Sequence, residues 1–240
     1  MAIWLFAAKE LAQHKTDVST ILSENKAHTT NWYATKAKQF QFGYALIPDT
    51  DTYDNTGITD EQIEAAKVVK YAAARQARDK SITYIKVATG EGSQKEPLID
   101  AQLTALTAYL NEIADSGVRF LIINAPPDEM KLVIDYYYDP LILDYEGKRL
   151  DGTNDTPVQD AVRSYISELE FNGVYTNQGL VDKLQVVDGG VIAELQSASS
   201  RYGTYLDFMP INARSVPYAG YYAISDENLI INFISNEEYL

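Results

Sequence analysis

The side chains best suited to chemistry in this chain are its carboxylates. Asp49-Thr-Asp51 is the only tight Asp-x-Asp pair, and two acids at that spacing could hold magnesium for nucleotidyl transfer. The pair lies in IPDTDTYDNTG, a run of residues that favour turns through local side-chain hydrogen bonds and special backbone angles. No Gly-Ser signature precedes it on a helix. We therefore interpret the pair as part of a solvated loop and keep the metal site as an alternative.

The other candidates for chemistry are weaker. Asp135 and Asp139 stand four residues apart on an expected strand, so both point to one face and could approach a third acid, although a solvent face is the simpler interpretation. His14 and His28 have no acidic cluster nearby at ligand spacing. The run Gly90–Ser93 lacks the lysine and third glycine of a phosphate-binding loop and reads as a turn. We therefore predict no catalytic residue, no metal site and no cofactor.

Tyrosine is the residue used in excess, with 18 tyrosines against 2 tryptophans and 7 phenylalanines. A tyrosine ring buries a large area while its hydroxyl keeps a polar partner, which suits a surface that meets another subunit. Successive strand residues face opposite ways, so the three consecutive tyrosines from 136 to 138 cannot enter one core, and the same holds for the pair at 221 and 222. The candidate interface residues are Tyr136, Tyr137, Tyr138, Tyr221, Tyr222 and Trp32.

The composition of the chain limits the kinds of partner and of cross-link that we expect. With 240 residues, 46% of them hydrophobic, the chain can bury a sizeable core divided among small units. Its net charge of −14 repels phosphate backbones and anionic lipids, so we expect no nucleic-acid or membrane partner. The absence of cysteine excludes disulfides and thiolate ligands. The apolar run at the N-terminus is too short to span a bilayer.

Helical spacing and turn residues divide the chain into three segments. Residues 1–55 are expected to form a helical arm and a loop, because apolar residues recur at helical intervals before the turn-rich run. Residues 56–150 are expected to form a β-α-β-β unit. In it, a capping box at Thr59 and Gln62 opens a helix that runs to near Arg78. The remaining elements are a strand over 81–89, a helix from Pro97 to Gly117, and a hairpin of strands 118–124 and 130–138.

Residues 151–240 are expected to form a second unit of order α-α-β-β-β. Thr156 and Gln159 match a capping box, and Pro157 takes the first helical position, where its missing N–H costs nothing. A short helix over 177–187, a strand over 191–199 and a terminal hairpin of 218–225 with 228–234 follow. The predicted fold class is therefore α+β.

Seven segments carry a likeness to a known family: AKQFQFG (37–43), VVKYAAARQ (68–76), SITYIKVA (81–88), PLIDAQLTALTAYLNEIADSGVRF (97–120), MKLVIDYYYDPLIL (130–143), PVQDAVRSYISELEFNG (157–173) and PYAGYY (217–222). Together they resemble the baseplate J-like tail proteins of phages and prophages of gut Bacteroidetes. The likeness covers most of residues 30–235, with an N-terminal region shorter than in the longer members. It implies a fold and an order of units, and it supplies no catalytic residue. Proteins of this family form wedges around the tail hub, usually in six-fold rings, through contacts between copies and neighbours.

The resemblance and the tyrosines lead to one expected function and two alternatives. We expect a non-enzymatic structural component of a phage tail or baseplate, which binds other tail proteins and copies of itself. Its expected place is the virion, with the host cytoplasm during assembly. The first alternative is a nucleotide-handling enzyme such as a nucleotidyltransferase, which would use Asp49 and Asp51. The second is a module that binds a host surface molecule through exposed aromatic rings.

Overall fold

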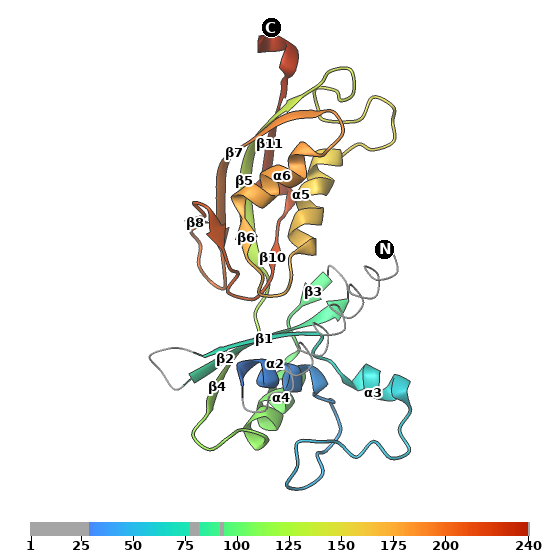
Figure 1. Ribbon diagram of the computed structural model, residues 1–240, viewed down its shortest axis with the longest axis vertical. Helices are drawn as coiled ribbons and strands as arrows, with labels where there is room; N and C mark the ends of the chain where they lie inside the picture. Colours follow the sequence, from blue (N-terminus) through green and yellow to red (C-terminus); the bar gives the residue numbers. More distant parts are fainter. Residues whose placement is uncertain (1–28, 77–81, 92–93, 240) are drawn as a thin grey trace, which may run out of the picture. The chain divides into compact units, whose positions relative to one another are not determined.

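The computed structural model describes residues 29–76, 82–91 and 94–239 and has a mixed α+β fold (Figure 1), which confirms the predicted class. Two compact units divide the chain: residues 1–89 with 98–124, and residues 90–97 with 125–240. The expected boundaries near 55 and 150 each fall inside one of these units. Most of the expected N-terminal arm, residues 1–28, lies outside the described residues.

The first unit is built around the strand β2 (Ile82–Glu91). Strand β1 (Tyr71–Gln76) pairs antiparallel with it, and β4 (Arg119–Ile123) pairs parallel. Strand β3 (Gln94–Glu96) pairs with β2 as the fourth strand of this sheet, and its residues are counted with the second unit. Helices α2 (Thr30–Gln39) and α4 (Asp100–Glu112) pack on one face, over the buried side chains of Ile85 and Val87.

The expected helix from Thr59 to near Arg78 is wrong in its second half. Helix α3 (Asp60–Ala66) has the predicted capping box but ends at Ala66, and the alanine-rich run that follows is strand β1. Alanine has the highest helix propensity, but tertiary packing can override that preference. Here Ala72 and Ala74 pack against the core to which α2 contributes, so small strand residues suit the position.

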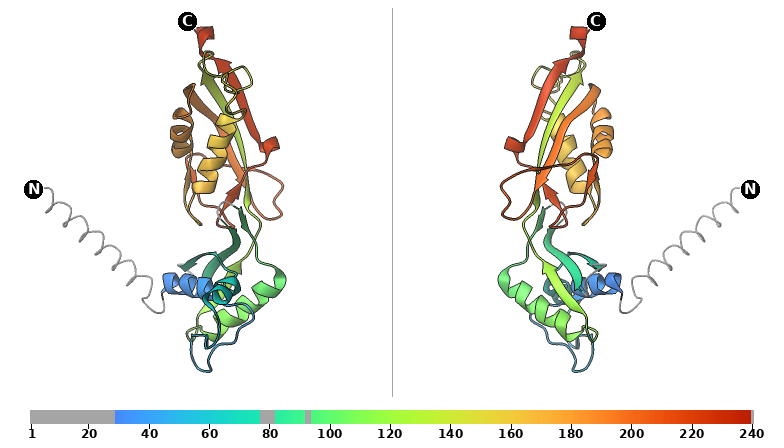
Figure 2. Two further views of the ribbon diagram at one scale, coloured as in Figure 1. Left: turned by 90° about the vertical axis from the view of Figure 1, so that its right-hand side faces the viewer. Right: turned by 90° about the vertical axis from the view of Figure 1, so that its left-hand side faces the viewer.

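The second unit is a five-stranded sheet centred on β5 (Asp128–Tyr138). Strand β7 (Gly190–Arg201) pairs antiparallel with one edge of β5, and β8 (Met209–Pro210) pairs with β7. On the other edge, β10 (Tyr222–Ala223) and β11 (Leu229–Ser235) both run parallel to β5. Figure 2 shows α5 (Pro157–Glu168) and α6 (Asn177–Gln185) together on one side of this sheet. The remaining elements are β6 (Tyr175–Thr176), β9 (Arg214–Ser215), and the 3-10 turns η1 (Asp226–Asn228) and η2 (Asn236–Tyr239).

Both expected hairpins are wrong. Strand β4 belongs to the first sheet and β5 to the second. The segment between them contains Pro126 and Pro127, which have no N–H for a ladder. The side chain of Asn124 also ties the end of β4 back to Leu98, through bonds of 2.7 and 2.9 Å with its backbone N–H and C=O. At the C-terminus, η1 lies between β10 and β11, and both strands pair with β5 instead of with each other.

The predicted start of a helix is confirmed where the capping side chain hydrogen-bonds to the first turn of that helix. Thr59 Oγ1 accepts from the Gln62 N–H at 3.3 Å, and Gln62 Oε1 accepts from the Thr59 N–H at 3.1 Å, as predicted. At Thr156 the predicted capping box is wrong, because the hydroxyl accepts from no backbone N–H of the first turn and instead donates to the Asp160 carboxylate at 3.3 Å. Helix α4 is shorter than the expected span from 97 to 117.

Candidate functional site

The pleat of β5 separates the three consecutive tyrosines as the alternation predicts. Tyr136 and Tyr138 are 0% and 6% exposed and belong to the core beneath α5 and α6. The Tyr136 hydroxyl donates to the Leu184 carbonyl at 3.2 Å, and burial raises the pKa of Tyr136 to about 12. Both rings make edge contacts with Phe233. These two tyrosines serve the fold and offer no surface to a partner.

Tyr221 and Tyr222 are also covered by their own chain, with exposures of 7% and 8%. Tyr222 contacts the ring of Tyr175, and Tyr221 lies against Phe171 and donates its hydroxyl to the Ala125 carbonyl at 3.0 Å. The two rings therefore meet different neighbours, as their consecutive positions require, but neither is left for a second protein. Tyr221 and Tyr222 therefore do not belong to an exposed interface.

Tyr137 is the tyrosine of this strand that lies on the face away from the helices. It pairs with Ile192 of β7 on one side and Ile234 of β11 on the other, which makes an apolar row across three strands. Four residues earlier on the same face, Val133 pairs with Ile230. Ile192 is 50% exposed and Ile230 40%, while the other three are partly exposed. We call these five residues, Val133, Tyr137, Ile192, Ile230 and Ile234, the open face.

A polar row separates the two apolar rows of the open face. Asp135 accepts hydrogen bonds from Gln196 Nε2 at 2.8 Å and Asn232 Nδ2 at 2.7 Å. Asp139 instead accepts from the Leu141 N–H at 2.9 Å in the turn after the strand. The two acids thus have separate structural partners, and among the residues that the structure describes no third acid joins them to form a metal site.

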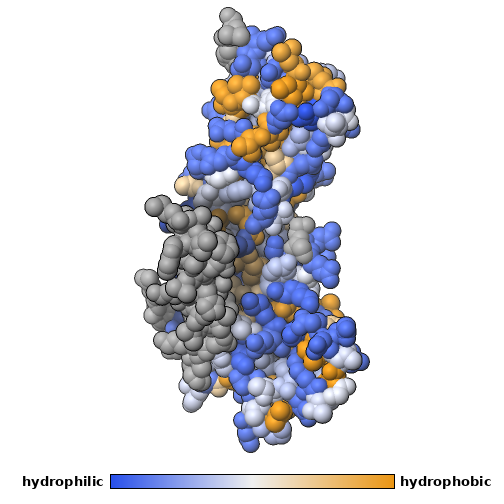
Figure 3. All heavy atoms as spheres, turned by 45° about the vertical axis from the view of Figure 1, so that its right-hand side comes forward, coloured by the Kyte–Doolittle hydropathy of each residue, from blue (hydrophilic) through white to orange (hydrophobic). Residues whose placement is uncertain are grey.

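Exposed apolar residues also gather at the end of the second sheet where β5 ends and β7 begins. The loop after β5 is held to the turn before β7, because the Asp139 N–H donates to the Gly189 carbonyl at 2.9 Å and Arg149 pairs with Asp188 at 2.6 Å. Figure 3 shows orange apolar patches among hydrophilic atoms on the visible face of this unit. We call the residues of this region that are 44% to 82% exposed the end patch: Leu141, Tyr145, Leu150, Val186 and Val191.

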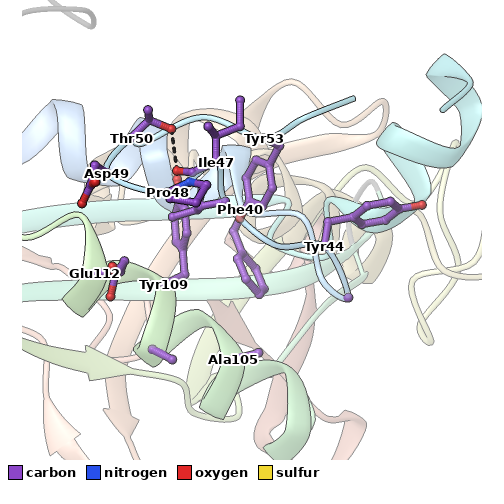
Figure 4. A pocket seen from close by; sticks show the side chains of 13 residues that line it. Phe40, Tyr44, Ile47, Pro48, Asp49, Thr50, Tyr53, Ala105, Tyr109 and Glu112 are labelled. Carbon is purple, nitrogen blue, oxygen red and sulfur yellow. Dashed lines mark hydrogen bonds between the residues drawn. The ribbon is translucent and has the colours of Figure 1, made fainter. Parts of the chain in front are cut away.

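The first unit contains a hollow of about 420 Å³ walled by aromatic rings (Figure 4). Phe40 follows α2, Tyr53 follows the loop over residues 46–52, and Tyr109 comes from α4. The hollow was not predicted from the sequence. Its walls come from three segments that are far apart in the chain, and no local sequence pattern indicates that they lie close together. Asp49 lines it, as does Glu112 at the end of α4.

Asp49 and Asp51, for which a metal site was the alternative interpretation, have different surroundings. Asp51 forms an ion pair with Lys36 at 2.7 Å, and this ammonium lowers the pKa of the Asp51 carboxyl. Lys36 also lies 5.5 Å from the ring centre of Trp32, the remaining candidate interface residue, which is partly exposed. Within the described ranges, no three acids or histidines are grouped so that they could hold a metal ion. Of the other sequence candidates, His14, His28, Gly92 and Ser93 lie outside those ranges, and Gly90 lies in β2.

Comparisons with known proteins assign this chain to no family. No protein-family model matches the chain, and no curated protein matches it. In the part of the chain that the structure describes, no helix has the length and apolar character needed to cross a membrane.

Proposed function

We propose that this chain is a structural subunit of a phage tail, of the baseplate J-like kind, which acts by binding and has no catalytic role. Its partners in this proposal are other baseplate proteins and copies of itself, and its place is the virion. The resemblance of the segments between residues 37 and 222 motivates the proposal. The open face is the observation that carries it, because a half-buried sheet face with two apolar rows is suited to a protein partner.

The composition of the open face supports this use. Interface cores are depleted of charge and enriched in aromatic residues, and their binding energy is concentrated in a few central rings. Tyr137 is the only ring among these five residues, and it lies between Ile192 and Ile234. The end patch adds further exposed apolar side chains near the start of β7, where Val191 is 44% exposed.

The test replaces Tyr137 with aspartate and measures association of the purified chain with itself and with co-expressed neighbouring tail proteins, by sedimentation velocity. A charge at the centre of an apolar interface is expected to weaken association by a factor of about 30 or more. The matched control is Tyr205→Asp, the same change at a ring that is 63% exposed in the loop after β7. Circular dichroism checks that both variants are folded.

A second measurement asks whether the chain is in particles at all. Mass spectrometry of purified tails is expected to detect it as a stoichiometric component, and tails assembled with Tyr137→Asp should lack it. If particles contain none of the chain, or if both aspartate variants associate like the wild type, the assembly role is wrong.

A further inference from the structure

The aromatic hollow of the first unit has the form of a small-ligand site. Its volume of about 420 Å³ is within the range of ligand pockets. The rings of Tyr53 and Tyr109 are stacked with centres 5.8 Å apart, and Phe40 lies 5.3 Å from Tyr109. Helix α4 contributes Ala105 and Ala108, whose small side chains leave space between the rings and the helix.

One side of the hollow is acidic. Asp49 and Glu112 lie on the same side of the hollow, beside the ring of Tyr109 (Figure 4). In the described part of the chain, neither carboxylate forms an ion pair. Two carboxylates beside aromatic faces attract a cation, because the ring quadrupole and the negative charges act in the same direction.

The chain itself places a cation in similar surroundings next to this hollow. The ammonium of Lys36 pairs with Asp51 at 2.7 Å and lies 5.5 Å from the ring centre of Trp32. A second hollow, lined by Trp32 and Asp51, shares Asp49, Thr50 and Glu112 with the first. A carboxylate together with an aromatic ring therefore already holds one ammonium at the border of the empty space.

A buried hydroxyl in the wall provides an independent observation. Tyr109 is only 6% exposed, and its hydroxyl has no hydrogen-bond partner among the described residues. Buried polar groups are nearly always hydrogen-bonded, and leaving one without a partner costs free energy. Less than 1 Å² of its oxygen is accessible, so a polar group bound in the hollow would satisfy this hydroxyl once the side chain shifts toward the hollow, whereas a purely apolar ligand would not.

We propose that the hollow binds a small organic cation, a primary ammonium or guanidinium carried on an apolar body. The body lies among Phe40, Tyr53 and Tyr109, and the cation faces Asp49 and Glu112, with the Tyr109 hydroxyl as a further polar contact. The same chemistry is available from a free amine or from a lysine or arginine side chain of another protein. The site is independent of the proposed assembly role.

The test is isothermal titration of the full chain with probes that differ in charge. Phenethylamine supplies the cation on an aromatic body, 2-phenylethanol is its neutral analogue, and phenylacetate is its anionic analogue. The capped peptide acetyl-Gly-Lys-Gly-amide presents a lysine side chain. We expect one of the two cationic probes to bind at one site, with an affinity that falls as salt is raised, and the neutral and anionic analogues to bind more weakly.

Three variants locate the site. Glu112→Gln and Asp49→Asn each remove one carboxylate and are expected to weaken binding about two- to fivefold. Asparagine tolerates the left-handed backbone of Asp49, whose φ is 61°. Tyr109→Phe keeps the ring, removes the hydroxyl without a partner, and is expected to weaken binding about threefold to tenfold. The control is Asp100→Asn at the other end of α4, an exposed acid outside the hollow.

The outcomes distinguish a free amine from a side chain of another protein as the source of the cation, and they can overturn the proposal. Binding of phenethylamine identifies a free amine, whereas binding of the lysine peptide alone identifies a side chain of a partner protein. The proposal is wrong if no cationic probe binds, if the neutral analogue binds as tightly as the amine, or if Asp100→Asn weakens binding as much as Glu112→Gln. Thermal unfolding of each variant checks that lost binding does not reflect a lost fold.

Discussion

Asp128 shows how a single buried acid can hold distant parts of the second unit together. Its side chain is 3% exposed, and its two oxygens accept hydrogen bonds from the backbone N–H groups of Tyr218 at 2.6 Å and Ala219 at 2.9 Å. Its own N–H donates to the Tyr221 carbonyl at 3.0 Å. The acid thereby fixes the segment before β10 against the first residue of β5.

Replacement of this acid by asparagine is expected to destabilise the protein. An amide has one acceptor oxygen, so in Asp128→Asn its NH₂ group would face a backbone N–H that has lost its partner. The expected loss is about 2–3 kcal/mol in the free energy of unfolding, measured by guanidinium denaturation. The matched control is Asp135→Asn on the partly exposed face of the same strand, with an expected change within about 0.5 kcal/mol. Equal losses in the two variants would show that the Asp128 contacts do not stabilise the fold.

At the scale of single elements, the sequence predicted the features that depend on neighbouring residues, such as which side chains of a strand share a face. Because a strand has a period of two residues, the alternation predicted that Tyr137 faces away from its two neighbours, and the structure shows that Tyr136 and Tyr138 are the buried ones. Pairing between strands depends on residues far apart in the chain, so Ile192 and Ile234 could not be predicted as neighbours of Tyr137. Strand β1 was missed for the same reason, since its alanines become strand residues only when β2 and α2 are in place.

The two predicted capping boxes provide an experiment at this scale. Of the two threonines, only Thr59 accepts from a backbone N–H in the first turn of its helix, so Thr59→Ala is expected to destabilise α3 by about 1 kcal/mol. Thr156→Ala removes no such bond and should destabilise α5 by less. Hydrogen exchange at the amides of Ile63 and Asp160 reports on the two helices separately. Similar acceleration in both helices would contradict the role of the Thr59 side chain.

At the scale of the whole molecule, the two units have separate hydrophobic cores. Leu106 lies in the first core and Leu132 in the second, each with an exposure of 0%, and the two cores share no residue. Each core closes around its own sheet and helices. The loss of a buried side chain in one core should therefore leave the stability of the other unit unchanged.

Trp32 allows the units to be followed separately, because it packs against the core of the first. The only other tryptophan, Trp4, lies outside the described residues, so the experiment uses Trp4→Phe as its background. Leu106→Ala is expected to cost about 2–5 kcal/mol and to lower the urea midpoint followed by tryptophan fluorescence. Leu132→Ala should cost a similar amount but lower only a transition followed by circular dichroism, leaving the fluorescence midpoint in place. If both variants shift both signals equally, the units unfold as one cooperative body, and the separation of the cores does not extend to their stability.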